Sequence, residues 1–436
     1  MISSTRLVSR LPRIAPGRAP RLARSLATET ASSSADQPNF PLPQKHPPQS
    51  KPRSLLYPHP RPSPSQYHSI LPELPPSFGR NQILSVSNST RALLESIVAQ
   101  FNAPIRYAFA YGSGVFEQDG YNKPASPDDP NSPMLDFMFA VTHPDHFHSI
   151  NMHQHASHYP LHSRIFGSDY VSRVQAIGPG VWFNAYVPMK GVTIKYGVTT
   201  IDNLCSDLLN WNTLYLAGRM HKPVRIIKDD ARVRLTQQVN LTSAVRAALL
   251  TLPSEFTELE LFERIAGISY SGDPRMLLPA ENRSKVSNIV RTQAPQFKEL
   301  YHRLVVGLPG TYWPAHMSTI KQDSSPQARA NHLKKLPKVL LSRVKNYYDA
   351  NSGYVIEKDE SAYWVKLAGD DRLQKVITRE MAGIVRRPAT VQSLKGIVSA
   401  GIGKSARYTL AKVGKWWKGQ EKKNGSSPES SSSKSS

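Results

Sequence analysis

The sequence predicts an α+β protein in which a small mixed or antiparallel sheet is followed by a helical part. Apolar runs at residues 105–111 and 135–141 have the length of strands and are bounded by turn residues. A second pair, at 181–187 and 192–199, flanks a short turn and indicates a β-hairpin. From Leu241 onward the apolar residues recur at helical spacing. Strands followed by helices are typical of α+β architecture.

The folded region is expected to begin near Phe78. Residues 87–90 offer N-cap side chains for a helix over about 91–101. The segment 117–133, between the first two strands, is rich in Asp, Asn, Pro and Ser and predicts a loop.

Two further elements follow the hairpin. Asp202 or Asn203 can cap a helix that continues through Leu216 and ends at Gly218. Residues 223–228 then read as a short strand. These elements complete the predicted α+β core.

The later part of the chain predicts a smaller helical domain of winged-helix type. One helix is expected over 241–252. Residues 257–260 form a capping box that opens a second helix, which continues to Ile265. Helices over 283–291 and 296–304 follow.

Bulk composition limits the function classes. The 436 residues leave room for two compact domains plus tails, and the net charge of +23 predicts an anionic partner. Nucleic acid, anionic lipid and nucleotide phosphate all satisfy that charge. The single cysteine, Cys205, excludes an intramolecular disulfide, and no apolar run is long enough to span a bilayer.

Both ends of the chain differ from the predicted core. The first 28 residues hold six arginines and no acid, which is typical of a mitochondrial presequence, assigned to 1–35. A basic disordered tail is the alternative. Thirteen prolines between residues 37 and 76 indicate an extended linker over 36–77. The Ser-rich residues 420–436 are expected to be disordered.

The most informative motif is a strand that ends in Tyr111-Gly112-Ser113-Gly114 and is followed by a strand with one acid, Asp136. A Gly-Ser turn exposes backbone N–H groups and a hydroxyl that suit a triphosphate. An acid on an apolar strand suits a bound cation. Together they predict metal-assisted nucleotidyl transfer, with Tyr111 to Gly114 binding nucleotide and Asp136 binding Mg²⁺.

This motif departs from the polymerase-β type of nucleotidyltransferase, in which two alternating acids share a strand. The alternating neighbours of Asp136 are Met134 and Met138, so the second acid is missing. A buried, hydrogen-bonded carboxylate is the structural alternative for Asp136. Asp202 and Asp207 are fallback metal ligands.

Basic residues near this motif are candidates for phosphate contacts. An inward Lys195 would neutralise the triphosphate and serve catalysis, and its neighbour Tyr196 is assigned to nucleotide binding. A solvated edge lysine is the alternative. Arg219 and Lys222 follow a helix end and would bind a second phosphate, that of a lipid, or else complement the helix dipole.

Seven of the fourteen histidines fall between His143 and His162. Nearby cysteines are missing, and so is the helical spacing of a histidine zinc site. We therefore expect a polar helix or loop, without zinc. Asp273 and Arg275, further along, either close over the cleft or fix a turn.

The segment 391–419 is basic and amphipathic. It contains no acid, and its apolar residues recur near helical spacing. Cations opposite an apolar face with terminal tryptophans predict a helix in a membrane interface. An RNA-binding tail is the alternative. The segment also contains Lys395, and the membrane contacts are assigned to Lys404, Arg407, Lys412, Lys415, Trp416 and Trp417.

At this point the chain resembles the mitochondrial phosphatidate cytidylyltransferases, also called translocator assembly and maintenance proteins. The resemblance extends from Phe78 to about Gly419. It rests on the motifs at 111–115, 135–137, 194–198, 207–212, 216–219 and 266–273.

The resemblance implies a peripheral enzyme on the matrix side of the mitochondrial inner membrane. It would convert CTP and phosphatidic acid to CDP-diacylglycerol and pyrophosphate, for cardiolipin synthesis. The expected cofactor is Mg²⁺ and the expected surface is an anionic, cardiolipin-rich membrane. We expect no nucleic acid partner, and the sequence identifies no stable protein partner.

The resemblance also divides the chain. It implies a nucleotidyltransferase domain over 78–235, a winged-helix-like domain over 236–330, a helical extension over 331–390 and the membrane segment. Two rival hypotheses remain: an RNA-directed nucleotidyltransferase, and a non-catalytic membrane scaffold for protein-import machinery.

The missing second acid has a chemical explanation if the acceptor is a phosphate. A phosphomonoester has a second pKa of about 6 and is already largely ionised at matrix pH. Such a nucleophile needs no extra carboxylate to remove a proton. Catalysis then depends on alignment and charge neutralisation.

Overall fold

The computed structural model describes residues 74–75, 77–112, 114–116, 134–277, 284–351 and 359–400. All of them belong to one compact unit. The predicted presequence, nearly all of the linker, Ser113, the loop 117–133 and the C-terminal residues from 401 onward lie outside these ranges.

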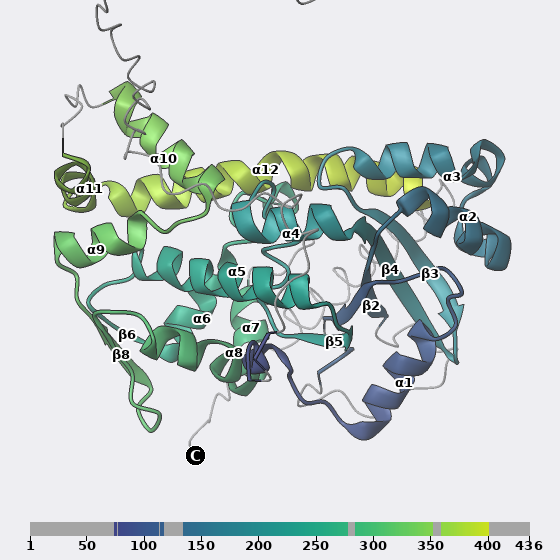
Figure 1. Cartoon of the computed structure of the whole chain (residues 1–436), viewed down its shortest axis with the longest axis horizontal. Coiled ribbons are helices and arrows are strands. Elements are labelled where there is room, and N and C mark those ends of the chain that lie inside the picture. The colour runs from purple at the N-terminus through teal and green to yellow at the C-terminus, as the bar shows by residue number, and fades with distance from the viewer. Residues whose placement is uncertain are drawn as a thin grey trace, which may run out of the picture. The chain divides into compact units, whose positions relative to one another are not determined.

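Five strands form a mixed sheet, as predicted (Figure 1). They are β1 (Tyr107–Tyr111), β2 (Leu135–Val141), β3 (Trp182–Met189), β4 (Val192–Thr200) and β5 (Val224–Lys228). Their order is β3-β4-β2-β1-β5, and only β2 and β4 pair in parallel. The predicted hairpin is confirmed as β3 and β4.

The β2–β4 register organises the centre of the sheet. Asp136 pairs with Lys195, and the next residues, Phe137 and Tyr196, pair with each other. Because side chains alternate along a strand, these two pairs lie on opposite faces. Phe137 and Tyr196 are fully buried, whereas Asp136 and Lys195 are partly exposed.

The helices before β5 surround this sheet. They are η2 (Arg80–Gln82), α1 (Asn88–Val98), α2 (Pro144–Gln154), η3 (Ala156–His158), α3 (Leu161–Ala176) and α4 (Ile201–Asn210). Ser87 caps α1 by accepting a hydrogen bond from the Thr90 N–H, as the sequence predicted.

The predicted helix through Leu216 is wrong at both ends. Thr200, the last residue of β4, caps α4 in place of Asp202 or Asn203. The helix ends before Trp211, which adopts a left-handed conformation with φ of 56°. The residues up to Gly218 form turns, because a buried side chain takes the N–H groups that a helix would use.

The next part begins with α5 (Ala231–Leu249), which starts ten residues before the predicted helix at 241. Asp230 caps it through the Arg232 and Val233 N–H groups. Its first half was missed because Arg232, Thr236 and Asn240 are polar but buried, which hides the apolar period.

A small antiparallel sheet accompanies the helices that follow α5. The elements are β6 (Glu255–Thr257), α6 (Glu258–Gly267), η4 (Pro274–Leu277), α7 (Lys285–Thr292), α8 (Ala294–Val306), β7 (Thr311–Tyr312) and β8 (Thr319–Gln322). The strand order is β6-β8-β7. The predicted capping box of Thr257 and Glu260 is confirmed at the start of α6.

Four helices complete the described chain: α9 (Pro326–Leu333), α10 (Lys338–Asn351), α11 (Glu360–Ala368) and α12 (Leu373–Ala400). The 28-residue α12 packs against α10, β3 and η4. It therefore joins the helical part to the large sheet (Figure 1). No helix in the described ranges is long and apolar enough to cross a bilayer.

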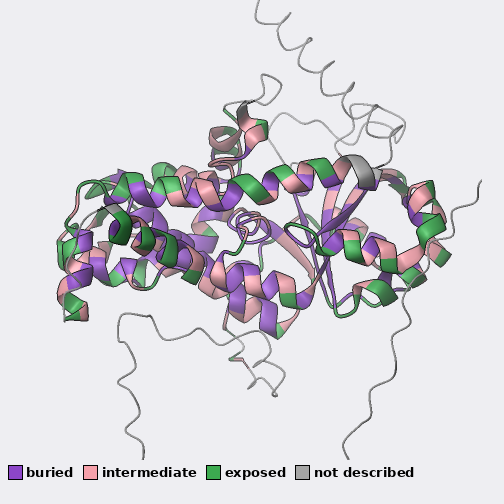
Figure 2. Cartoon of the chain, turned by 90° about the horizontal axis from the view of Figure 1, so that it is seen from above, coloured by how far each residue is buried: buried purple, intermediate pink, exposed green. Residues whose placement is uncertain are grey.

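One hydrophobic core runs through both sheets and the helices around them. It extends from Phe139 in the large sheet through Phe262 and Tyr301 to Trp364 and Ile377. Figure 2 shows these buried residues inside the layer of exposed helix faces. The edge of the large sheet is thus held rigidly against the helical part.

Candidate functional site

The centre of the candidate site is the pair Asp136 and Lys195. Nζ of Lys195 lies 3.5 Å from Oδ1 of Asp136 and 4.8 Å from the centre of the Phe183 ring. Oδ1 of Asp136 is buried and accepts no hydrogen bond from the described residues. A buried carboxylate oxygen without a donor is costly unless a ligand completes it. The predicted inward orientation of Lys195 is therefore found.

The end of β1 approaches this carboxylate closely. Gly112 adopts φ of 92°, and a Cβ atom there would lie 3.4 Å from Oδ2 of Asp136. The positive φ favours glycine, and the missing side chain leaves space in front of the carboxylate. The chain then turns tightly, with the Val115 N–H donating to the Gly112 carbonyl oxygen. Gly112 thus shapes the place where the sequence predicted a phosphate.

Tyr111 and Arg219 form the next wall. The Arg219 guanidinium lies 4.4 Å from the centre of the Tyr111 ring and 5.2 Å from that of Tyr215. Burial raises the pKa of Tyr111 well above its usual range, and the positive charges of Arg219 and Arg275 oppose that shift. The Tyr111 hydroxyl is buried without a hydrogen-bond partner in the described ranges. The hydroxyl therefore stays neutral and can serve a ligand.

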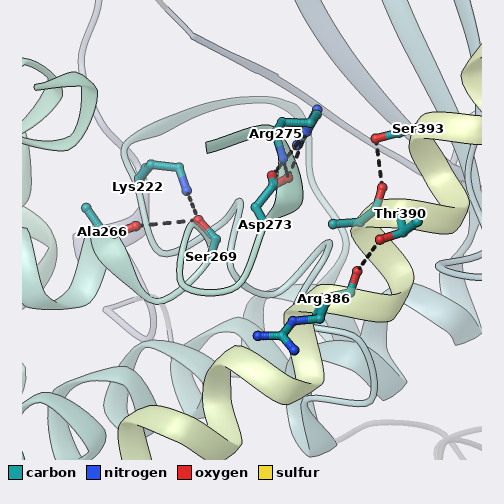
Figure 3. A network of polar contacts seen from close by, with 9 residues as sticks. Lys222, Ala266, Ser269, Asp273, Arg275, Arg386, Thr390 and Ser393 are labelled. Atoms are coloured by element: carbon teal, nitrogen blue, oxygen red, sulfur yellow. Dashed lines mark hydrogen bonds and ion pairs between the residues drawn. The ribbon is translucent and has the colours of Figure 1, made fainter. Parts of the chain in front are cut away.

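Lys222 lies behind Arg219. Its Nζ donates to the Gly218 carbonyl oxygen at 2.7 Å and to Ser269 Oγ at 2.8 Å, and lies 5.0 Å from the centre of the Tyr270 ring (Figure 3). Lys285 approaches the same ring at 5.5 Å. Burial, with the charges of Arg219 and Lys285, lowers the pKa of Lys222 well below its usual range. An incoming anion would stabilise the charged form of this lysine.

The loop after α6 brings Asp273 and Arg275 to this side. Arg275 donates to both carboxylate oxygens of Asp273 at 2.6–3.1 Å (Figure 3). Although burial opposes it, this contact lowers the pKa of Asp273. Gly272, with φ of 84°, lies against α12 so closely that a Cβ would be 2.3 Å from the Ala382 carbonyl oxygen. The pair thus fixes a turn, one of the two roles considered.

The donor set of Asp136 suits a hard divalent cation. Mg²⁺ is usually held by one or two carboxylates, with water and substrate phosphates completing its shell. One buried carboxylate oxygen beside an open glycine meets that need. Within the described residues, no group of three His, Cys, Asp or Glu side chains is placed to hold a metal alone. The residues therefore fit a cation that arrives with a phosphate ligand.

Both fallback metal ligands were wrong. Asp207 is buried, and its two oxygens accept hydrogen bonds from the N–H groups of four residues and one hydroxyl, at 2.7–3.2 Å. These donors come from Thr213, Leu214, Leu216 and Ala217. Asp202 pairs with Arg232 at 2.6 Å. Asp207 therefore holds the turn that positions Arg219, and it has no free lone pair for a metal.

Tyr196 requires a second correction, because it lies on the other face of β4 from Lys195. Its hydroxyl is within 2.8 Å of Asn151, His158 and Asn184 in a fully buried network. Strand alternation gave the wrong residue a nucleotide contact. His148 contributes to the same network through Tyr159. The histidine-rich segment thus forms helices around a buried polar core.

Lys395 also differs from its predicted environment. It lies on α12, is 6% exposed, and donates to the carbonyl oxygens of Gln175 and Ile177 at 3.0 and 2.7 Å. Burial lowers its pKa to about 8. The assigned membrane residues from Lys404 to Trp417 lie outside the described ranges.

The structure adds residues that sequence reasoning missed. Ser269 and Tyr270 lie in a motif that had been noticed without a role. Lys285 had no distinguishing signal, since a single lysine at a helix start is common. All three become visible only when the loop after α6 folds against Lys222.

A carboxylate with an open oxygen, faced by lysines and arginines from several elements, defines an enzyme site for phosphate-bearing substrates. Comparison with known families makes this class specific. The family described as "Phosphatidate cytidylyltransferase, mitochondrial" matches residues 94–415. The chain belongs to that family.

Individual relatives agree. A Xenopus laevis protein with that name is 39% identical over 333 residues, which cover 76% of this chain and 96% of the relative. A Saccharomyces cerevisiae protein of the same name is 35% identical over 343 residues, covering 78% and 74%. One from Bos taurus is 38% identical over 343 residues, covering 78% and 99%.

Proposed function

We propose that this protein is a phosphatidate cytidylyltransferase that joins CTP and phosphatidic acid to give CDP-diacylglycerol and pyrophosphate. The observation that carries the proposal is the open Oδ1 of Asp136, 3.5 Å from Lys195. Family membership supplies the substrate pair, and the cationic walls suit two phosphate groups.

In this reaction a phosphate oxygen of phosphatidic acid attacks the α-phosphorus of CTP. A new P–O–P bond forms, and the bond between the α- and β-phosphates breaks, so that pyrophosphate leaves with its electron pair. The nucleophile is already ionised near neutral pH, so no carboxylate has to take a proton from it. The task of the protein is to align two anions and offset their charge.

The two basic groups divide this task. Lys195, beside Asp136, neutralises the CTP triphosphate at the end of β1, where Gly112 leaves room for it. Arg219, stacked on Tyr111, and Lys222 behind it hold the phosphate of the lipid. The distance of Arg219 from Asp136 through one tyrosine ring keeps the two phosphates adjacent but distinct.

Asp136 would hold Mg²⁺, which supplies positive charge to the phosphates when bound. The open Oδ1 and the space at Gly112 support this assignment. Phosphate oxygens of CTP and water would complete the shell, in keeping with the single carboxylate.

The fold supports finer assignments. We assign residues 78–235, with the mixed sheet and the Gly-Ser turn, to a nucleotidyltransferase-like domain. The helices and three-stranded sheet of 236–330 suit a winged-helix-like domain. The N-terminal 35 residues are assigned to a presequence, and residues 391–419 to a membrane segment.

We place the enzyme on the matrix side of the mitochondrial inner membrane, as a peripheral protein on a cardiolipin-rich surface. The relatives are named mitochondrial, and no helix within the described ranges spans a bilayer. The basic C-terminal segment supports contact with anionic lipid.

One assay tests the function and its rivals. Purified protein receives Mg²⁺, labelled CTP, and either phosphatidic acid vesicles or RNA. We expect labelled CDP-diacylglycerol and an equal amount of pyrophosphate with the lipid only. Incorporation of label into RNA would support the RNA-directed rival, and no pyrophosphate with any acceptor would support a scaffold.

A further inference from the structure

An exposed apolar cluster lies on the first half of α3. Leu161, Ile165 and Phe166 are 65–70% exposed, and the first two are one helical turn apart. Gly167 interrupts the helix with φ of 80° and ψ of −176°, so these residues form a separate short tip. Single exposed apolar residues are ordinary, but three within one and a half turns form a contact surface. Arg164 in the same tip is also exposed.

The end of α12 is fixed to the other end of α3. Lys395 donates to the carbonyl oxygens of Gln175 and Ile177, and Val391 packs against Gly178. Two more exposed apolar residues, Ile177 and Leu394, flank this junction, at 56% and 62%. Both helices lie along the upper edge of Figure 1. The chain beyond residue 400, with its cations and tryptophans, therefore starts beside the apolar cluster.

The outer face of α12 is basic. Its exposed cations recur at spacings of three, four and seven residues, which place them on one face of the helix. They are Arg372, just before α12, and Lys375, Arg379, Arg386 and Arg387. The helix itself contains a single acid, Glu380, which pairs with Arg379 and Arg343. In Figure 2, exposed residues of α12 face the viewer along much of its length.

We propose that the basic face of α12 and the apolar tip of α3 form one docking surface for an anionic lipid bilayer. This inference rests on the proposed function, since a lipid substrate must be reached at a bilayer. The cations would meet lipid phosphates, and Leu161, Ile165 and Phe166 would enter the interface. Charge complementarity and the position where the C-terminal segment leaves α12 select a bilayer over a soluble partner.

This orientation also places the site. Gly272, next to the Asp273–Arg275 turn, lies directly against Ala382 of α12. A bilayer on the outer face of α12 would therefore be separated from that turn by one helix. The Arg219 and Lys222 wall, linked to the turn through Ser269, would lie near the lipid headgroups.

The basic face is tested by vesicle flotation of the full chain, with phosphatidylcholine vesicles that contain phosphatidic acid and cardiolipin. The test variant carries Arg372→Gln, Lys375→Gln and Arg387→Gln. Each cation near such a surface contributes about fivefold to partition, so we expect at least a tenfold loss. The matched control, Lys190→Gln, Arg291→Gln and Arg303→Gln, removes the same charge from other exposed positions and should change partition less than twofold. Equal losses in both variants would overturn the inference.

The apolar tip is tested with a fluorescent label. Cys205 is buried and is the sole cysteine, so Phe166→Cys can be labelled selectively with an environment-sensitive dye. We expect a blue shift on addition of vesicles, at low and high salt. A label at Tyr312→Cys, exposed on β7, should not shift. A Phe166→Cys label that is shielded without lipid, by a second copy or by the C-terminal segment, would contradict the proposal, as would an unshifted label in bound protein.

Turnover separates this inference from the proposed function. The basic-face variant should convert a short-chain, water-soluble phosphatidic acid at the normal rate and vesicle-bound phosphatidic acid at least tenfold more slowly. Equal rates for wild type and variant on vesicles would refute the docking surface while the enzyme activity stands. If no CDP-diacylglycerol forms from either substrate, the proposed function fails, and flotation still judges the surface.

Discussion

Nζ of Lys195 lies 3.5 Å from Oδ1 of Asp136, because the parallel register of β2 and β4 places the two residues side by side. The carboxylate keeps an oxygen that accepts no hydrogen bond from the described residues. One acid and one lysine thus share a face on which polymerase-type enzymes carry two acids. This composition suits an acceptor that is already an anion.

Removal of the Asp136 charge should abolish most of the activity. Asp136→Asn keeps the shape but loses the anionic ligand, so kcat for CDP-diacylglycerol synthesis should fall at least about a hundredfold. The melting temperature should not fall, since Oδ1 has no protein hydrogen bond to lose. Wild-type activity should disappear with EDTA and return with Mg²⁺. Near-normal turnover by the variant would refute the assignment of Asp136.

Lys195 should contribute to turnover through its charge. Lys195→Gln is expected to lower kcat/KM for CTP by about tenfold or more, because a desolvated cation beside the triphosphate is lost. Lys190→Gln, in the exposed turn of the same hairpin, is the control and should behave as wild type. If both variants lose activity equally, the cause lies in the hairpin and not in the ammonium group.

The Tyr111 hydroxyl offers a test of substrate contact. Its oxygen is buried without a partner in the described part of the chain, so Tyr111→Phe should leave the melting temperature unchanged or raise it. If the hydroxyl binds substrate, kcat/KM should still fall several-fold. A variant as active as wild type would restrict Tyr111 to supporting the Arg219 guanidinium.

Asp207 should be essential for folding and irrelevant to metal binding. Asp207→Asn replaces an acceptor of four backbone N–H groups by an amide that must turn an NH₂ toward some of them. We expect a loss of about 3 kcal/mol or more in the free energy of unfolding, measured by urea denaturation. The Mg²⁺ concentration for half-maximal activity should be unchanged in folded protein. A shift in that concentration would restore Asp207 as a metal ligand.

The buried histidine network should make the fold sensitive to mild acid. Burial lowers the pKa of His148 from 6.5 to about 4, so between these values the unfolded chain binds a proton that the native protein does not. Stability from this residue is therefore present above pH 6.5 and is lost as the pH falls toward 4. At pH 5 the loss is about 2 kcal/mol.

The matched variant for this prediction is His148→Gln. It should be less stable at pH 7.5, but its melting temperature should fall less than that of wild type between pH 7.5 and pH 5. Parallel curves for the two proteins would show that His148 does not carry the effect. His221 and His332, also lowered by burial, supply the remaining acid sensitivity.

The strands were predictable because short apolar runs between turn residues leave few alternatives. The capping box at Thr257 was predictable because its two hydrogen bonds join residues three apart. Helix α5 was not, since its polar residues Arg232, Thr236 and Asn240 are satisfied by distant parts of the fold. A pattern of apolar residues cannot represent polar groups that find buried partners.

The sequence by itself determined the mixed sheet, the Gly-Ser turn and the single strand acid, because these depend on neighbours along the chain. Only the tertiary structure decided that Lys195 meets Asp136, that Tyr196 turns away, and that Asp207 holds a turn in place of a metal. It also decided that Lys395 joins α12 to α3. Each of these contacts depends on strand register or on residues distant in sequence, and such contacts form only when the chain has closed on itself.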